Sequence, residues 1–144
     1  MHEQIEIIER GFEHSGRMAT ADEQARLTTA VEQAIAALDT GEARVAEQVD
    51  GEWRVNRWLK KAVLLSFRLA DNAVIESGHS RFYDKVPMKY ADYSPEDFRR
   101  DGVCILPDAI LRLGAFVAHD VVLMPSYVNV GAYVDSGTMV ETWA

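Results

Sequence analysis

The stretch that decides the fold runs from Cys104 to Ala144 and reads "CILPDAILRLGAFVAHDVVLMPSYVNVGAYVDSGTMVETWA". Apolar residues alternate there with small or polar ones, as in β-strands. The Asn-Gly and Asp-Gly dipeptides of tight hairpins do not occur in it. Instead, an apolar residue recurs at every sixth position, which gives the ladder Cys104, Ile110, Phe116, Val122, Val128, Val134 and Val140.

A period of six is the hexapeptide repeat of a parallel β-helix. Each hexad forms one side of a triangular coil, so residues three hexads apart should stack along the axis. We therefore expect Val128 on Ile110, Val134 on Phe116 and Val140 on Val122. Small residues four positions after a rung fit tight corners, namely Gly114, Ser126, Ala132 and Thr138. The alternative is an antiparallel meander with coincidental spacing, which would need hairpin turns that the stretch does not contain.

The repeat has room for about two coils before Val140 opens a third. Repeat structures stack about three or more units and carry polar caps, because an open last unit exposes apolar residues and a strand edge. We therefore expect the chain to be the front part of a longer protein. Its predicted fold class is α+β, with a mainly helical domain over residues 1–102 and the first coils of a parallel β-helix over residues 103–144.

The first part shows helical periodicity, interrupted by one hairpin signal. Asp50-Gly51, flanked by Val49 and Trp53, predicts a type I′ hairpin within residues 44–56. Residues 71–90 lose their periodicity, and we expect a loop there with at most one short strand. Helices are predicted over residues 3–15, from Thr20 or Asp22 to just before Gly41, over residues 57–71, and from a cap at Ser94 to Asp101-Gly102.

Composition narrows the class of partner. The formal net charge of −8 argues against nucleic acid or an anionic membrane as the main partner, because both require a basic face. A single cysteine, Cys104, excludes an internal disulfide and fits a reducing cytoplasm. The N-terminus is acidic and amphipathic, unlike a signal peptide. No P-loop or glycine-rich phosphate cradle occurs in the chain.

Three segments carry a resemblance to a known family: "WLKKAVLLSFR", "RFYDKVPMKYADY" and "VLMPSYVNVGAYVDSGTMVETWA". The chain resembles the bacterial tetrahydrodipicolinate N-succinyltransferases of lysine biosynthesis over essentially all of its length. The resemblance implies an N-terminal helical domain, a left-handed parallel β-helix and a homotrimer. It also implies transfer of a succinyl group from succinyl-CoA, a co-substrate, to the amine of ring-opened tetrahydrodipicolinate, without a permanently bound cofactor.

The resemblance also points to two site residues. The family's catalytic and substrate-contacting Asp falls at Glu141, which retains the carboxylate one methylene further out. A substrate-contacting Arg of the family falls at Cys104, which has no positive charge with which to bind a carboxylate. We expect Cys104 to be a small buried residue that continues the apolar ladder.

The remaining candidates have simpler interpretations. We expect the His119-Asp120 pair to lie on the surface without forming a dyad, and Trp58 and Phe67 to lie in the core. A metal site is not expected, because the repeat contains only one histidine. The cations flanking apolar stripes are expected to be surface charges: Arg57, Lys60, Lys61, Arg68, Arg81, Lys85 and Lys89.

Three functions remain open from the sequence. The first is the succinyltransferase, for which the 144 residues alone are expected to be inactive because CoA binds mostly to later coils in the family. The second is a non-catalytic module of the same fold that serves trimer assembly. The third is another hexapeptide-repeat acyltransferase, acting on a sugar amine.

Overall fold

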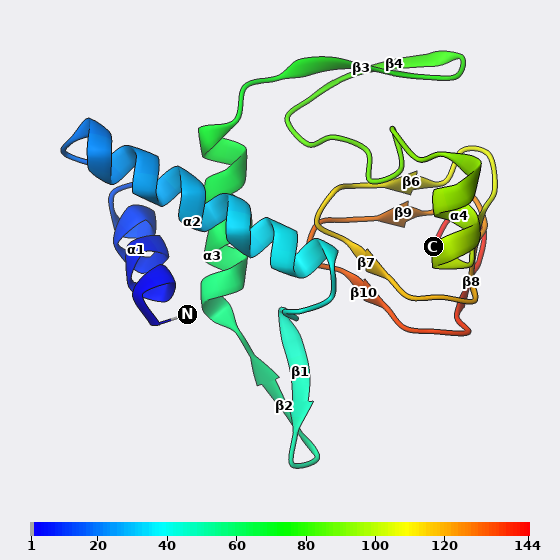
Figure 1. The fold of residues 1–144 in the computed structure, drawn as a ribbon, viewed down its shortest axis with the longest axis horizontal. Coiled ribbons are helices and arrows are strands. Elements are labelled where there is room, and N and C mark those ends of the chain that lie inside the picture. The colour runs from blue at the N-terminus through cyan, green and yellow to red at the C-terminus, as the bar shows by residue number, and fades with distance from the viewer. Residues whose placement is uncertain (1) are drawn as a thin grey trace.

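The computed structural model describes residues 2–144, which form a helical unit beside a coil of short parallel strands (Figure 1). The helical unit consists of α1 (His2–Glu13), α2 (Ala21–Asp39) and α3 (Arg57–Leu69). Each helix turns an apolar stripe inward, so that Ile8, Leu27 and Leu59 are fully buried between them. None of the helices described in residues 2–144 is long and apolar enough to cross a bilayer.

The ends of these helices follow the sequence signals. Thr20 caps α2 by accepting a hydrogen bond from the Glu23 backbone N–H at 3.2 Å, and the helix ends before Gly41, which adopts a φ of 78°. A short fourth helix, α4 (Pro95–Asp101), begins with a reciprocal capping box between Ser94 and Asp97. The predicted starts of α2 and α4 are therefore confirmed.

Two hairpins extend from the framework, one connected to each end of α3 (Figure 1). The first pairs β1 (Ala46–Val49) with β2 (Glu52–Val55) around Asp50-Gly51, both with positive φ, as predicted. The second pairs β3 (Ala73–Ser77) with β4 (Ser80–Asp84), where we expected a loop with at most one strand. That expectation was wrong because every residue of β3 and β4 is exposed or half-buried, so burial imposes no alternation on the sequence. Unlike β1–β2, this hairpin also has no Asp-Gly or Asn-Gly dipeptide at its turn.

The last third of the chain contains seven short strands that pair only in parallel. Each strand pairs with the one three further along, which gives the sheets β5–β8–β11, β6–β9 and β7–β10. These pairings exclude the antiparallel meander. The strands are β5 (Val103–Ile105), β6 (Ile110–Leu111), β7 (Phe116–Val117), β8 (Val121–Leu123), β9 (Tyr127–Val128), β10 (Tyr133–Val134) and β11 (Met139–Val140).

The register of these strands corrects the predicted ladder. Val128 lies on Leu111, Val134 on Val117 and Val140 on Leu123, not on the residues one position earlier. In the first coil, the inward residue is therefore the one that follows each predicted ladder residue, namely Leu111, Val117 and Leu123. Leu123 is fully buried. The spacing of six between inward residues is broken once, because Leu123 and Val128 are five positions apart. The predicted ladder, which kept a spacing of six throughout, was therefore out of phase in the first coil.

Residues with positive φ mark the corners of the coil. They fall six positions apart up to Asp120, and again from Gly131 onward. The corner between β8 and β9, at Met124-Pro125-Ser126, has no such residue and is one residue shorter. The corner residues are Gly102, Asp108, Gly114, Asp120, Gly131, Gly137 and Trp143.

A buried polar contact fastens the coil to the helices. The Asp39 carboxylate at the end of α2 accepts from Lys89 Nζ at 2.8 Å and from the Gly114 backbone N–H at 2.7 Å. Close by, Gly41 lies against the Phe116 ring, where a Cβ would come within 2.7 Å of the ring. The helical unit and the sheet β7–β10 are thus held in direct contact.

Candidate functional site

Glu141 lies at a corner of the coil, directly after β11. The Met124 backbone N–H donates to the Val140 carbonyl at 3.0 Å, which places Glu141 opposite Met124 in the coil below. A four-residue turn follows, closed by a hydrogen bond from the Ala144 N–H to the Glu141 carbonyl at 3.2 Å. The Glu141 side chain is exposed and makes no ion pair within residues 2–144. Its carboxylate is therefore available to a ligand.

Two hydrogen bonds clamp this turn over the shortened corner. The Trp143 N–H donates to the Pro125 carbonyl at 2.6 Å, and the Tyr127 N–H donates to the Ala144 carbonyl at 3.1 Å. Ser126, only 4% exposed, supports the corner from inside by donating its hydroxyl to the Met124 carbonyl at 2.7 Å. The backbone that carries Glu141 is consequently fixed to the preceding coil.

Cys104 occupies the first strand of the same sheet. It pairs with Val122, which pairs with Met139, so the three residues form one row across β5, β8 and β11. The row points outward, and Cys104 is exposed. The expectation of a buried filler was therefore wrong, because the inward position belongs to the next residue, Ile105, which packs against the core of the coil.

Cys104 and Glu141 do not meet within one chain. They lie on the two edge strands of a three-stranded sheet and two residues apart along the strand direction. With about 4.8 Å between strands and about 3.4 Å per residue, their backbones are about 12 Å apart. A ligand in contact with both side chains would have to span the width of the sheet.

A cavity of about 520 Å³ opens beside Cys104 at the first-coil end. Its lining comes from the coil, from α4 and from the segment before α4, and includes Tyr90, Phe98 and Leu111. Burial raises the pKa of Tyr90 above its ordinary value, which keeps the phenol neutral. No charged side chain lines the cavity, so it does not suit a dicarboxylate.

The candidate cations are mostly engaged in structural contacts. Lys89, expected at the surface, is only 7% exposed and pairs with Asp39. Lys61 pairs with Glu9, and the Arg68 guanidinium lies 5.3 Å from the centre of the Phe12 ring. Lys85 donates to the Ala70 carbonyl and Arg81 pairs with Glu76, whereas Arg57 and Lys60 remain exposed on α3.

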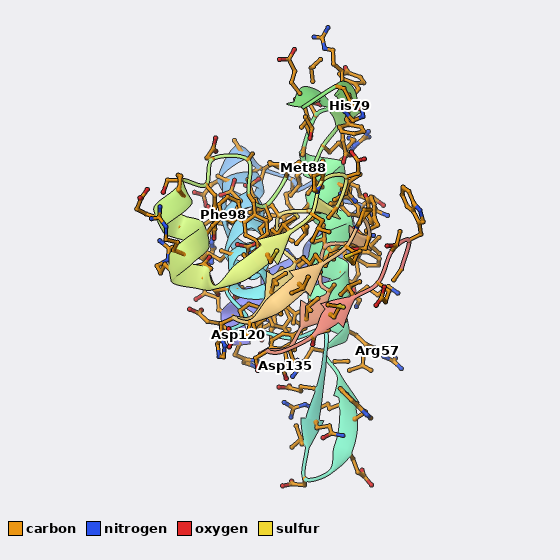
Figure 2. All side chains as sticks on the ribbon, turned by 90° about the vertical axis from the view of Figure 1, so that its right-hand side faces the viewer. Arg57, His79, Met88, Phe98, Asp120 and Asp135 are labelled. Carbon is orange, nitrogen blue, oxygen red and sulfur yellow. The ribbon has the colours of Figure 1, made fainter. Side chains whose placement is uncertain are left out.

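The His119-Asp120 pair also differs from expectation. Both side chains are exposed, as predicted, but His119 Nδ1 lies 2.9 Å from Asp120 Oδ2. Asp120 has a left-handed backbone, with a φ of 58°, and stands at a corner of the coil. Asp120 and Asp135 lie toward the same edge of the coil (Figure 2). Within residues 2–144 no three His, Cys, Asp or Glu side chains gather as a metal site would require.

Sequence reasoning missed the shortened corner that holds the Glu141 turn. Its signal was present in the spacing of glycine and aspartate. Corner residues recur at every sixth position from Gly102 to Asp120, and the next is Gly131, one residue early. The apolar ladder did not reveal the shorter spacing, because in the first coil each ladder residue is followed by a second apolar residue. Either residue of such a pair fits the pattern.

Comparisons with known proteins agree with the resemblance carried by the sequence. Residues 3–69 match the family model described as tetrahydrodipicolinate N-succinyltransferase N-terminal. Two relatives named 2,3,4,5-tetrahydropyridine-2,6-dicarboxylate N-succinyltransferase are each 56% identical to this chain. The one from Sodalis glossinidius (strain morsitans) aligns over 95% of this chain and 50% of its own length. The one from Acinetobacter baylyi aligns over 96% and 50%. The chain thus spans about half the length of the curated relatives it matches.

Proposed function

We propose that this chain, which is similar to the N-terminal part of the tetrahydrodipicolinate N-succinyltransferases, forms that part of a CoA-dependent N-succinyltransferase of lysine biosynthesis. The observation that carries the proposal is 56% identity to a relative of that name across 95% of the chain. The proposed reaction moves a succinyl group from succinyl-CoA to the amine of ring-opened tetrahydrodipicolinate. Succinyl-CoA acts as a co-substrate, and no cofactor stays bound.

The chemistry requires a base near the attacking amine. The amine nitrogen must lose a proton as it bonds to the thioester carbonyl carbon, whose oxygen becomes an oxyanion before the CoA thiolate leaves. We assign the base to Glu141, whose exposed carboxylate is held on a clamped turn. The departing thiolate takes up a proton, so the products are the succinyl amide and free CoA.

Cys104 has a more limited role in this proposal. Its thiol cannot pair with a carboxylate as a guanidinium does. We propose that the Cys104 side chain makes only van der Waals contact with the substrate, from the row that it shares with Val122 and Met139. Charge recognition of the two acceptor carboxylates then falls to other groups.

We further propose that residues 103–144 are the first coils of a left-handed parallel β-helix, following a helical domain at residues 1–102. The parallel pairings and the recurrence of left-handed corner residues at intervals of six support this assignment. The assembly proposed is a homotrimer in the cytoplasm. Residues on two neighbouring subunits could then complete a site that one chain leaves open, since Cys104 and Glu141 are about 12 Å apart.

The proposed activity can be tested in a chimaera. Residues 1–144 are joined to the C-terminal half of the Sodalis glossinidius relative, and release of CoA thiol is followed with succinyl-CoA and the acceptor. We expect turnover that falls about 10²- to 10⁴-fold in Glu141→Gln, because the base is lost. The matched control Glu52→Gln, on the exposed hairpin β1–β2, should retain full activity. The 144 residues alone should show no turnover.

The separation of Cys104 and Glu141 also favours a second candidate, the non-catalytic assembly module. A chimaera that assembles into trimers but releases no thiol would support that module and reject the enzyme. Equal activity of Glu141→Gln and the parent chimaera would leave the succinyltransferase standing but reject Glu141 as its base.

A further inference from the structure

The proposed reaction leaves unused the cavity of about 520 Å³ at the first-coil end. It lies between the first coil, α4 and the segment before α4, with Ser77 of the hairpin β3–β4 at its edge. Met88 and Phe98, which both line it, lie on the side of the coil away from Asp135 (Figure 2). The whole lining comes from residues 77–111, so β9, β10 and β11 contribute nothing to it.

Backbone hydrogen bonds fix one wall of the cavity. The Lys89 N–H donates to the Leu111 carbonyl at 2.8 Å. The Leu113 N–H donates to the Pro87 carbonyl at 2.9 Å. These two bonds hold the segment before α4 against the first coil, on both sides of Met88.

Three aromatic rings close the wall between that segment and α4. The centre of the Tyr90 ring lies 4.7 Å from that of Tyr93 and 5.5 Å from that of Phe98. The Tyr93 hydroxyl donates to the Asp101 carboxylate at 2.7 Å, which anchors the rings to the last residue of α4. Walls fixed in this way form the cavity without a ligand, as is usual for small-molecule sites.

The charge of the lining selects against ions. No Asp, Glu, Lys, Arg or His side chain lines the cavity. Two nearby cations are engaged elsewhere, since Lys89 pairs with Asp39 and Arg112 pairs with Asp84. An ion that entered would lose its hydration without gaining an opposite charge, whereas an apolar ring gains by leaving water. The cavity therefore favours an uncharged ligand.

The few polar side chains of the lining indicate one further group on that ligand. They are the hydroxyls of Ser77 and Tyr90 and the thiol of Cys104. The Tyr90 hydroxyl makes no hydrogen bond within residues 2–144, whereas that of Tyr93 is paired. Burial raises the pKa of Tyr90, so its phenol keeps the proton. A half-buried phenol of this kind can donate to an acceptor oxygen on a ligand.

We propose that the cavity binds a small uncharged ring compound that carries a carbonyl oxygen, and that the Tyr90 hydroxyl donates to this oxygen. The ring lies against apolar side chains of the lining, among them Phe98, Ile105 and Leu111. The site is separate from the proposed reaction, and its test requires no turnover.

The first test follows the methionine methyl groups of the 144-residue chain by NMR, with acetophenone as the probe. The chain has five methionines, and only Met88 lines the cavity. Their signals are assigned by single Met→Leu variants. We expect acetophenone to shift the Met88 signal and to leave that of Met139, on β11, in place. Benzoate has the same ring with a carboxylate, and at the same concentration it should shift neither. An unmoved Met88 signal, or equal shifts with both probes, would overturn the proposal.

The second test separates the hydroxyl from the ring contacts. Tyr90→Phe removes only the O–H group, so we expect acetophenone to bind about three- to tenfold more weakly. Ethylbenzene has no acceptor and should bind equally to the variant and the parent. The control Tyr83→Phe, on the exposed hairpin β3–β4, should bind both probes as the parent does. Unchanged acetophenone affinity in Tyr90→Phe contradicts the assigned donor.

The third test fills the cavity from its edge. Ala91 lines the cavity and is exposed, so Ala91→Phe occupies the space without replacing a core residue. We expect this variant to lose the acetophenone shift of Met88. Ala46→Phe makes the same change at an exposed position of β1 and should retain the shift. An Ala91→Phe chain that binds acetophenone as well as the parent would place the ligand elsewhere and refute the site.

The chimaera with the Sodalis glossinidius relative distinguishes this site from the enzymatic function. Because the lining ends at Leu111, acetophenone should shift the Met88 signal of the chimaera as it does in the 144-residue chain. A chimaera that turns over but shows no Met88 shift retains the function and rejects the site. A chimaera without turnover that still shows the shift rejects the function and retains the site.

Discussion

Among single residues, Lys89 is one whose substitution should destabilise the fold. Its ammonium and the Asp39 carboxylate form a largely buried pair that joins the segment before α4 to the end of α2. Lys89→Met leaves the Asp39 carboxylate without its charged partner, and we expect a loss of about 3–5 kcal/mol in the free energy of unfolding. Urea unfolding measures it. The surface pair of Arg99 and Glu96 is the control, and Arg99→Met should cost under about 1 kcal/mol.

Asp97 predicts a specific dependence on acid. Hydrogen bonds from the Ser94 side chain and backbone N–H, and then from Arg100, lower the pKa of Asp97 to about 2. Because the folded pKa lies below the unfolded value of about 3.9, the stabilisation is complete above pH 4 and lost as the pH falls towards 2. We expect the melting temperature of Asp97→Asn to depend less on pH across that interval. Parallel curves for the parent and the variant would contradict this role.

At the scale of the strand, the register makes a prediction about neighbouring residues. Leu123 is fully buried in the coil, whereas Val122 precedes it on the outward face and is partly exposed. Leu123→Ala should cost about 2–5 kcal/mol in the free energy of unfolding. Val122→Ala should cost less than half as much. The reverse order would restore the ladder that the sequence first suggested.

Elements with a burial pattern or with a local turn or capping signal could be predicted from the sequence, and elements with neither could not. Helix caps and tight turns depend on the residues at the cap or turn itself. Thr20 and Ser94 therefore indicated the starts of α2 and α4 correctly. Asp50-Gly51 likewise indicated its own turn. The hairpin β3–β4 is exposed on both faces and left no such mark. The phase of the coil was ambiguous because adjacent apolar residues satisfy either phase, and only the glycine and aspartate corners carried the shorter spacing.

The candidate site depended on a likeness in sequence more than on physics. Glu141 could be singled out only through its motif, because an exposed carboxylate has no burial signature. The turn that carries Glu141 is held by a hydrogen bond from the Trp143 N–H to the Pro125 carbonyl in the preceding coil. No local sequence pattern predicts a hydrogen bond between residues so far apart in the chain. The left-handed backbone of Trp143 was equally hidden, since a tryptophan does not suggest positive φ.

For the whole molecule, the proposed trimer predicts which face is covered. The outward row of Cys104, Val122 and Met139 forms an apolar strip on the sheet β5–β8–β11, and Met139 is 58% exposed in the single chain. If this strip lies between subunits, Met139→Glu should bury a charge there and shift the mass measured by light scattering from trimer to monomer. Tyr127→Glu, on the sheet β6–β9 and 53% exposed, is the matched control and should remain trimeric. Alkylation of the Cys104 thiol gives a second readout, because it should speed up in Met139→Glu as the strip becomes accessible. A parent chain that stays monomeric at all concentrations, or a Cys104 that reacts equally fast in both, would place the subunit contact elsewhere or remove it.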